Sequence, residues 1–520
     1  MPNAKPTPML ETFDGYVRWW AGKSGDDVAL QEGDTHTTFA ELEDRTARAV
    51  AMFRDLGVKK GDRIAWLGKN ALLYFELFYA AGRMGAVMVP IGWRLAAPEV
   101  AYILQDTAAK VLFVGEGFDD AASSACGELG TPPRRVSQDE AEDLLSAANP
   151  ASFEAAGADD PVLQLYTSGT TGNPKGAVLT NRNLFALRQP GEQAGVPWAT
   201  WEEGEAILIA MPCAHIGGTG LGIMAIGAGV RAIVQAEFTP DGVFDAFEDG
   251  ATRMFIVPAA LQMVVQHPRA ARTDFSHVRY VLYGAAPIPL DLLREAVETI
   301  PNAGFVQCYG MTETTGTVCA LPPEDHDLGG NDRMRSAGKA VPGAEVRVIG
   351  EDGSELPRGE VGELIIRSPS NMAGYWNLED ATREALRDGW MHTGDAAYMD
   401  EDGYVFIQDR IKDMIITGGE NVYPAQVESA IYGHPAVAEV AVIGVPDDTW
   451  GEAVKACIVP REGMAVDADA IIEHTRARLA GFKVPKSVDV IEALPRNASG
   501  KILRRELRAP YWEGRERQVN

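Results

Sequence analysis

Tyr166-Thr-Ser-Gly-Thr-Thr-Gly-Asn-Pro-Lys-Gly176 is the most informative segment of this 520-residue chain. An apolar run at 162–165 leads into it and a second at 177–179 follows, which predicts a strand, a glycine-rich loop and another strand. The loop contains three glycines, four serine or threonine side chains and one lysine, and it has no acidic residue. Because glycines allow a ligand to approach backbone N–H groups and the lysine adds positive charge, we expect this loop to bind a polyphosphate.

The loop is not a Walker A motif, which needs a glycine directly before the lysine and a serine or threonine after it. Pro174 precedes Lys175 here, and Gly176 follows it. A surface loop without function is the simpler alternative. The complete string, however, resembles the signature phosphate loop of the adenylate-forming enzymes, which include acyl-CoA synthetases, peptide-synthetase adenylation domains and luciferases. The resemblance implies that ATP is bound by Thr167, Ser168, Gly169, Thr170, Thr171, Gly172 and Lys175.

Composition limits the class of protein independently of any motif. The length indicates more than one domain, and the hydrophobic and charged fractions, 46% and 23%, are ordinary for globular proteins. A formal net charge of −27 argues against nucleic acid or an anionic membrane as a partner. Five scattered cysteines without a CxxC pair favour a reduced, cytoplasmic protein with no disulfide framework or zinc site. The assembly state is open, and a homodimer is one alternative.

Residues 206–230 are uncharged over a length that could span a bilayer. The stretch also contains a proline, a histidine and several glycines. We therefore expect a buried strand, a polar turn and a core helix there, and no integral membrane association.

Strand and helix patterns alternate through the first part of the chain, which predicts parallel α/β subdomains. Residues 117–158 are expected to be a helical or irregular connection. The expected strands lie at 63–67, 87–90, 110–114, 253–257, 278–283 and 305–308. Ligands bind at the carboxyl ends of parallel strands, so the loops 166–176, 284–287 and 309–314 are the candidate site loops.

The pattern changes after about residue 335, where short alternating strands and Asp-Gly turns indicate a small antiparallel subdomain. Beyond the charged segment 409–413, helices and strands alternate again. The sequence thus predicts an N-terminal domain over 1–408, made of doubly wound α/β subdomains plus a small β subdomain. A hinge at 409–413 and a small, mobile α+β C-terminal domain over 414–520 follow.

Tyr309-Gly-Met-Thr-Glu313 follows a predicted strand and ends in a carboxylate. A carboxylate beside a polyphosphate can hold Mg²⁺, although an acid stabilised by a helix N-terminus is the simpler alternative. The string matches the fifth core motif of the adenylate-forming family. The resemblance implies that Tyr309 stacks on adenine, that Thr312 contacts the α-phosphate during catalysis, and that Glu313 binds magnesium.

Two further segments are assigned to the nucleotide by the same resemblance. Gly284, Ala285 and Ala286 have small side chains and correspond to the other face of the adenine slot. Asp395, in Thr393-Gly-Asp395, corresponds to the acid that binds the ribose hydroxyls, and Arg410 is expected to support it. Without the resemblance, both segments would be read as turns.

The C-terminal part carries two more family motifs. Pro495-Arg-Asn-Ala-Ser-Gly-Lys501 resembles the last core motif, which implies that Lys501 is catalytic, binds ATP and bridges the attacking carboxylate and the α-phosphate. The segment 409–424 resembles the eighth motif. It implies a hinge at Lys412 and a loop at Gly418 and Gly419 that reaches coenzyme A after the domain rotates.

A third group concerns the acid substrate. His215 lies in Pro212-Cys-Ala-His215, and the family pattern has an aromatic residue where Ala214 stands here. The resemblance implies that His215 is catalytic and gates an acyl pocket that Cys308 and Gly310 also line. The small Ala214 would widen this pocket, whereas Cys308, often glycine in relatives, would narrow it.

Together these motifs predict an AMP-forming acyl-CoA synthetase, an acid–thiol ligase. It would convert a small-molecule carboxylic acid into an acyl-adenylate and then a thioester, with ATP, Mg²⁺ and coenzyme A. The expected acid is a fatty acid with a medium or long chain, or a hydrophobic aryl or ring acid. A luciferase-like enzyme, or another adenylate-forming enzyme with a different acceptor, is the alternative. A non-catalytic nucleotide- or lipid-binding relative is disfavoured because Glu313 and Lys501 are both intact.

Overall fold

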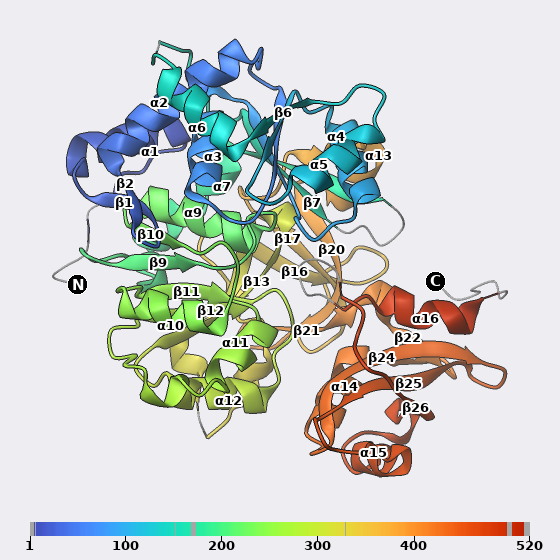
Figure 1. Ribbon diagram of the computed structural model, residues 1–520. Coiled ribbons are helices and arrows are strands. Elements are labelled where there is room, and N and C mark those ends of the chain that lie inside the picture. The colour runs from blue at the N-terminus through green and yellow to red at the C-terminus, as the bar shows by residue number, and fades with distance from the viewer. Residues whose placement is uncertain are drawn as a thin grey trace.

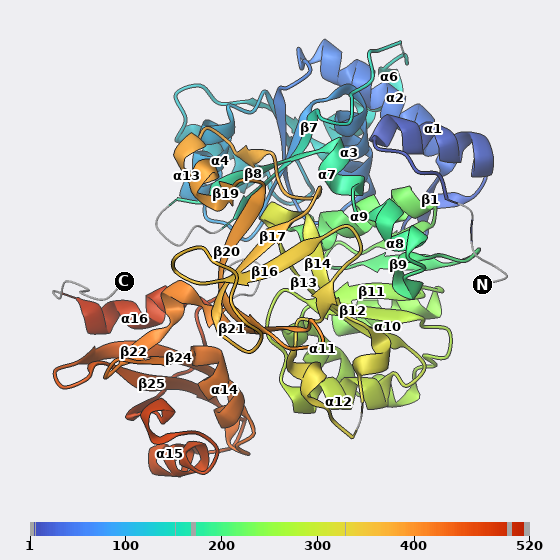
Figure 2. The same cartoon turned by 180° about the vertical axis from the view of Figure 1, so that it is seen from behind.

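The structure, a computed structural model, describes residues 5, 7–150, 152–167, 173–327, 329–496 and 502–513. These residues form four β-sheets with helices packed around them. Two α/β subdomains lie against each other, a small β subdomain lies beside both, and the C-terminal residues form a separate lobe (Figures 1 and 2). The predicted fold class is confirmed.

The first subdomain is built on a seven-stranded sheet. In spatial order its strands are β18 (Gly374–Tyr375), β8 (Lys175–Thr180), β7 (Pro161–Thr167), β4 (Val87–Ile91), β3 (Arg63–Leu67), β5 (Val111–Val114) and β6 (Arg134–Ser137). Its helices are α1 (Phe13–Ser24), α2 (Phe39–Asp55), α3 (Leu72–Met84), α4 (Ala97–Thr107), α5 (Asp119–Gly127), α6 (Gln138–Ala147) and α7 (Asn181–Phe185). The strands from β7 to β6 are parallel, and β3 and β4 are buried at every position, which explains their continuous apolar sequences.

The second subdomain is built on a nine-stranded sheet. Its strands, in spatial order, are β15 (Lys339–Ala340), β14 (Gly316–Leu321), β13 (Gly304–Met311), β12 (Tyr280–Gly284), β11 (Arg253–Ile256), β9 (Ala206–Ile209), β10 (Arg231–Val234), β1 (Val28–Glu32) and β2 (Thr35–Thr38). Its helices are α8 (Arg188–Gln193), α9 (Ile216–Ala228), α10 (Pro240–Glu248), α11 (Pro258–Val265) and α12 (Leu290–Thr299). The strands from β1 to β13 in this order are parallel, and α10 begins at the predicted Thr239 cap, whose side chain accepts from the Gly242 N–H.

Helices α3 and α9 join the two subdomains into one core. Every residue of α3 is buried, and Tyr79 donates to the carbonyl of Gly222 on α9 at 2.8 Å. A Cβ at Gly222 would lie 2.4 Å from the ring of Phe75, so this close crossing requires glycine. The uncharged stretch 206–230 is therefore the predicted buried strand and core helix. Among the described residues, no helix is long and apolar enough to cross a membrane.

The small β subdomain is an antiparallel sheet with one short helix, α13 (Glu379–Ala385). Its strands are β16 (Glu345–Ile349), β17 (Gly362–Arg367), β20 (Trp390–Met399), β19 (Leu386–Arg387) and β21 (Val405–Arg410). The C-terminal lobe contains a second five-stranded sheet, made of β23 (Glu420–Val422), β22 (Ile415–Thr417), β25 (Gly451–Pro460), β24 (Val437–Asp447) and β26 (Ser487–Val490). Its helices are α14 (Pro424–Tyr432), α15 (Ala468–Arg476) and α16 (Arg504–Trp512).

One expectation for the connecting regions was incomplete. The segment 117–158, expected as a helical or irregular connection, contains the strand β6 between α5 and α6. Only Val136 of β6 is buried, so this edge strand has too little apolar periodicity to be found from sequence.

Candidate active site

The glycine-rich loop connects β7 to β8 in an antiparallel hairpin, in which Thr167 pairs with Lys175. Ser168, Gly169, Thr170, Thr171 and Gly172 lie outside the described residues. The Thr167 hydroxyl donates to Oε1 of Glu313 at 3.3 Å, and Nζ of Lys175 lies 5.1 Å from the ring centre of Tyr375. Both ends of the predicted phosphate loop therefore face the Glu313 region.

A chain of side chains holds the base of this loop. The Tyr166 phenol donates to Oδ2 of Asp106 and accepts a hydrogen bond from Nε2 of Gln164 at 3.1 Å. Nε of Arg63 donates to Gln164 at 3.2 Å, and its guanidinium lies 3.4 Å from the ring centre of Trp376. Burial, and then Asp106, raise the pKa of the Tyr166 phenol. The phenol therefore stays protonated and the anchor is complete at neutral pH.

Glu313 lies where the phosphate loop meets the end of β13. It is buried, with 5% of its surface exposed, and it accepts hydrogen bonds from Tyr375 at 2.8 Å and from Thr167 at 3.3 Å. Thr312 precedes it in the short turn η3 (Thr312–Thr314). Among the described residues, no three or more His, Cys, Asp or Glu side chains gather as metal ligands. A single carboxylate beside phosphates nevertheless fits Mg²⁺, which takes one or two carboxylates and completes its shell with phosphate oxygens and water.

Asp395, on β20, is joined to the two residues that the sequence placed around the nucleotide. Tyr309 donates to its Oδ2, and Nε of Arg410 lies 2.8 Å from its Oδ1. Arg410 also donates to the carbonyl of Thr393 at 2.8 Å. Each carboxylate oxygen retains lone pairs for further donors, so the arrangement is compatible with the predicted contact to ribose hydroxyls.

The segment after β12 provides an open backbone surface beside β13. A Cβ at Gly284 would lie 2.1 Å from the carbonyl oxygen of Cys308, so only glycine fits there. Ala285 has a φ of 65°, and both Ala285 and Ala286 are exposed. Small exposed side chains next to Tyr309 leave room for a flat ring, as the predicted adenine slot requires.

His215 occupies the N-cap position of α9, and its side chain makes no capping hydrogen bond there. Loss of solvation, and then the positive charge of Arg94, lower the pKa of His215 to about 4, so this imidazole is neutral at physiological pH. Cys308 is buried, and burial raises the pKa of its thiol to about 11. A Cβ at Gly310 would lie 1.7 Å from the carbonyl oxygen of Gly316, so backbone packing alone requires glycine there.

The predicted hinge, residues 409–413, begins at the end of β21 and precedes β22 of the C-terminal lobe. Lys412 falls in the turn η6 (Ile411–Asp413). Gly418 and Gly419 have φ values of 60° and 86° and form the hairpin turn between β22 and β23. Lys501 lies outside the described residues, in the segment just before α16.

Helix α16 contacts the acids at the two ends of the predicted hinge. Arg504 forms a bidentate pair with Glu428 on α14 at 2.8 Å and lies 3.9 Å from both Asp409 and Asp413. Asp409 also accepts from the N–H of Ala425 at 2.8 Å. Burial raises the pKa of Asp409 to about 6. Arg504 thereby connects α16, which follows the Lys501 segment, to both ends of the predicted hinge.

Three residues of this region were missed by the motifs. Tyr375 donates to Glu313, the carboxylate of Asp106 accepts from Tyr166, and the backbone carbonyl of Asp106 accepts from the Trp376 indole at 3.0 Å. The only local sign of these residues in the sequence is the aromatic pair in Gly374-Tyr-Trp376. An aromatic pair is equally expected in a buried edge strand, so it does not indicate a functional site.

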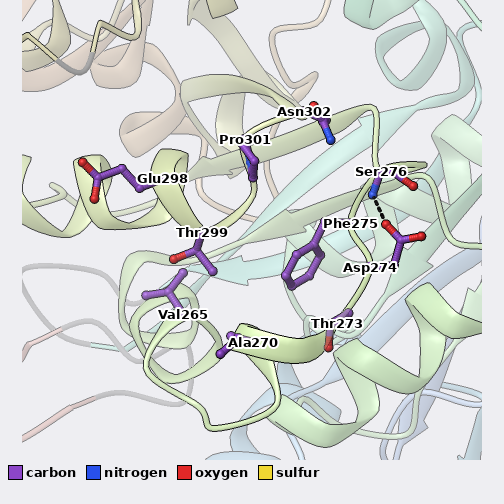
Figure 3. Close-up of a pocket in the computed structure, with 11 residues that line it drawn as sticks. Val265, Ala270, Thr273, Asp274, Phe275, Ser276, Glu298, Thr299, Pro301 and Asn302 are labelled. Carbon is purple, nitrogen blue, oxygen red and sulfur yellow. Dashed lines mark hydrogen bonds between the residues drawn. The ribbon is translucent and has the colours of Figure 1, made fainter.

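A cavity of about 450 Å³ opens elsewhere in the second subdomain, between the segments 265–276 and 298–302 (Figure 3). These segments precede β12 and β13 in the chain, so the cavity lies at the amino ends of the strands. The site loops follow the carboxyl ends of the same strands, where ligands bind in parallel sheets. The cavity is therefore not part of the candidate active site.

Comparisons with known proteins agree with this arrangement. Residues 17–376 match the family model for AMP-binding enzymes, and residues 426–501 match that for the AMP-binding enzyme C-terminal domain. The chain belongs to the AMP-binding enzymes, within the adenylate-forming superfamily. The predicted family resemblance is thus confirmed.

The relatives are ligases that act on carboxylic acids. A fatty acid–acyl-carrier-protein ligase of Streptomyces coeruleorubidus is 41% identical, covering 95% of each chain. A feruloyl-CoA synthase of Amycolatopsis is 40% identical, covering 93% of this chain and 96% of the relative. The o-succinylbenzoate coenzyme A synthetase of Bacillus subtilis, in complex with ATP and magnesium ion, superposes with a TM-score of 0.85 at 30% identity, covering 95% of this chain and 98% of that one. The prediction of an acid–thiol ligase is confirmed at this level.

Proposed function

We propose that the chain is an AMP-forming acyl-CoA synthetase that activates a hydrophobic carboxylic acid. The observation that carries the proposal is the position of Glu313, held by Tyr375 and Thr167 where the phosphate hairpin meets the end of β13. The Tyr309–Asp395–Arg410 group supplies the matching contacts for a nucleoside beside it. ATP and coenzyme A are the co-substrates of acyl-CoA ligases in this family.

In the first half-reaction, an oxygen of the substrate carboxylate attacks the α-phosphorus of ATP, and pyrophosphate leaves. Lys175 and the backbone of the glycine-rich loop bind the phosphates, and Thr312 contacts the α-phosphate. Glu313 would hold Mg²⁺, which when bound offsets the negative charge of the phosphates. Lys501 stabilises the negative charge that develops on the oxygens as the new bond forms.

In the second half-reaction, the thiol of coenzyme A attacks the carbonyl carbon of the acyl-adenylate and loses its proton. The bond between that carbon and the bridging oxygen breaks, and AMP leaves. Rotation at Lys412 brings Gly418 and Gly419 to the acceptor, so one acyl site serves both steps. Neutral His215 does not introduce a buried positive charge next to the apolar acyl group.

An acyl carrier protein is the alternative to coenzyme A as the thiol that accepts the acyl group, because a relative at 41% identity is a fatty acid–acyl-carrier-protein ligase. An acyl carrier protein presents the same kind of terminal thiol as coenzyme A. Parallel reactions with coenzyme A and with a phosphopantetheinylated carrier protein would separate the two acceptors. The proposal predicts faster thioester formation with coenzyme A.

The proposal is tested by exchange of labelled pyrophosphate into ATP with a panel of fatty and aryl acids. We expect exchange that requires an acid and magnesium but not coenzyme A, followed by AMP release when coenzyme A is added. Glu313→Gln should lower the exchange rate and raise the magnesium requirement. If no acid supports exchange or thioester formation, the proposed function is wrong.

The proposal places the enzyme in the cytoplasm, where cysteines remain reduced. For the assembly state, we propose a homodimer as one alternative. Fractionation of cells that produce the chain and light scattering of the purified chain test these two points.

A further inference from the structure

The strand β11 contributes a half-buried aromatic side chain, Phe255, to the face of the second sheet that α9 covers. Its neighbours Met254 and Ile256 are buried on the other face, against α10–α12. Because side chains alternate along a strand, Phe255 points toward α9. On that face it packs with Leu282 and Cys308 in one apolar cluster. Phe255 therefore shares a cluster with a residue predicted to line the acyl pocket.

The ring of Phe255 also contacts the first turn of α9. A Cβ at Gly217, two residues after His215, would lie 3.0 Å from Cε1 and 3.4 Å from Cδ1 of the ring. The ring thus occupies the volume into which a side chain at position 217 would extend. At β11, the Phe255 ring therefore fills the space between the sheet and the first turn of α9.

The strand register shows how far the ring lies from the reacting end of the site. Phe255 pairs with Leu282 on β12, and Leu282 pairs with Val306 on β13. Two strand spacings, roughly 10 Å, therefore separate Phe255 from the strand that carries Cys308 and Gly310. Gly310 lies four residues beyond Val306 on β13, which adds roughly 13 Å along the strand, so an acyl group that starts beside Gly310 and runs between α9 and the sheet meets the Phe255 ring after roughly 16 Å.

We propose that Phe255 is a specificity-determining residue that ends the acyl pocket and limits the substrate to compact acids. Such an acid has a single aromatic ring or a chain of medium length. The edge of the Phe255 ring also gives an aromatic substrate an edge-to-face partner. This inference rests on the proposed function, because it assumes that the acid lies between α9 and β13.

The test compares kcat/KM in pyrophosphate exchange for straight-chain acids of increasing length and for single-ring acids. Phe255→Leu and Phe255→Ala should move the chain-length optimum to longer acids. Each further methylene that becomes buried is worth roughly a factor of four, so acids several methylenes longer should gain about tenfold or more. The Leu variant keeps an apolar side chain, so the test remains available if the Ala variant does not fold.

A second variant tests the contact itself. Gly217→Ala should push the Phe255 ring toward the substrate and lower kcat/KM for the largest accepted acids. In the Phe255→Leu background, the same substitution should have a smaller effect, because the shorter side chain leaves room for the new methyl group. Phe247→Leu, in α10 on the opposite face of the sheet, is the matched control and should leave the length profile unchanged.

The outcomes are distinguishable. A longer optimum in the Phe255 variants, together with coupling to position 217, supports the inference. An active Phe255→Leu enzyme with the unmodified length profile overturns it and leaves the proposed function standing. Absence of exchange with every acid in the unmodified enzyme overturns both.

Discussion

The phenol of Tyr375 donates a hydrogen bond to Oε1 of Glu313 at 2.8 Å. The two residues come from different sheets, because Tyr375 lies on β18, which pairs with β8 of the phosphate hairpin, whereas Glu313 follows β13. Burial, and then Glu313, raise the pKa of the Tyr375 phenol, which keeps it a donor at neutral pH. Tyr375 therefore fixes one oxygen of the predicted magnesium ligand relative to the phosphate loop.

Replacing Tyr375 by Phe should weaken magnesium-dependent adenylation without unfolding the protein. A hydrogen bond to a charged group contributes about 1.5–3 kcal/mol, so we expect a loss of roughly tenfold to a hundredfold in exchange rate at limiting Mg²⁺. Excess Mg²⁺ should restore part of this loss. Magnesium titrations of the exchange reaction measure both effects. Tyr398→Phe, at a half-buried residue whose ring is stacked on Phe406, is the control and should titrate like the unmodified enzyme.

Tyr166→Phe should raise KM for ATP more than it lowers kcat. The variant removes the donor to Asp106 at the point where the chain enters the phosphate loop. The loop then loses an anchor whose net contribution is about 1–2 kcal/mol, which corresponds to roughly a fivefold to thirtyfold weaker ATP affinity. Steady-state kinetics with ATP varied at saturating acid would check this. An unchanged KM would show that the loop does not depend on this anchor.

Lys501→Ala should separate the two half-reactions. We expect acyl-adenylate formation to fall strongly, because the variant loses the ammonium that we propose stabilises the charge at phosphorus. Thioester formation from a chemically prepared acyl-adenylate should be much less affected. Rapid-quench measurements of each step give the two rates. Equal losses in both steps would contradict the role assigned to Lys501.

The raised pKa of Asp409 predicts a specific dependence of the free energy of unfolding on pH. Burial raises its folded-state pKa to about 6, above its unfolded value of about 3.9. Between these two pH values the folded state binds more protons than the unfolded state, so this group lowers stability as pH rises from 4 to 6. Asp409→Asn removes this pH-dependent contribution to the free energy of unfolding. The stability of the variant relative to the unmodified protein should therefore increase from pH 4 to pH 6 by up to about 3 kcal/mol. Denaturation midpoints at several pH values measure the trend, with the exposed acid Asp380 replaced by Asn as control. A parallel pH dependence of the two proteins would contradict it.

The parts of the site that sequence predicted are those whose chemistry is local in the chain. The glycine-rich loop and the Tyr309–Glu313 segment each combine strand, turn and polar groups within a few residues, and the structure brings their ends together. The parts that were missed depend on pairing between distant segments. Tyr375 is 62 residues from Glu313 in the sequence, and Asp106 is 60 residues from Tyr166. A short sequence motif cannot predict contacts between residues so far apart.

The errors in the predicted strands have a different cause, which is weak apolar periodicity. Buried parallel strands such as β3 and β4 have continuous apolar sequences and were predicted within one or two residues. In the edge strand β6 only Val136 is buried, and the buried positions of β20 include the polar residues Thr393 and Asp395, so the apolar periodicity of both sequences is weak. The motif that contains Asp395 was recognised, although the strand that carries it was not predicted.

The central claim, that a carboxylate oxygen attacks the α-phosphorus of ATP, is tested most directly with an acid labelled with ¹⁸O in its carboxyl group. The reaction is run to completion with coenzyme A, and the AMP is analysed by mass spectrometry. We predict that the AMP carries one ¹⁸O atom, because the bridging oxygen of the acyl-adenylate comes from the acid. Unlabelled AMP, or ADP and phosphate as the products, would contradict the account.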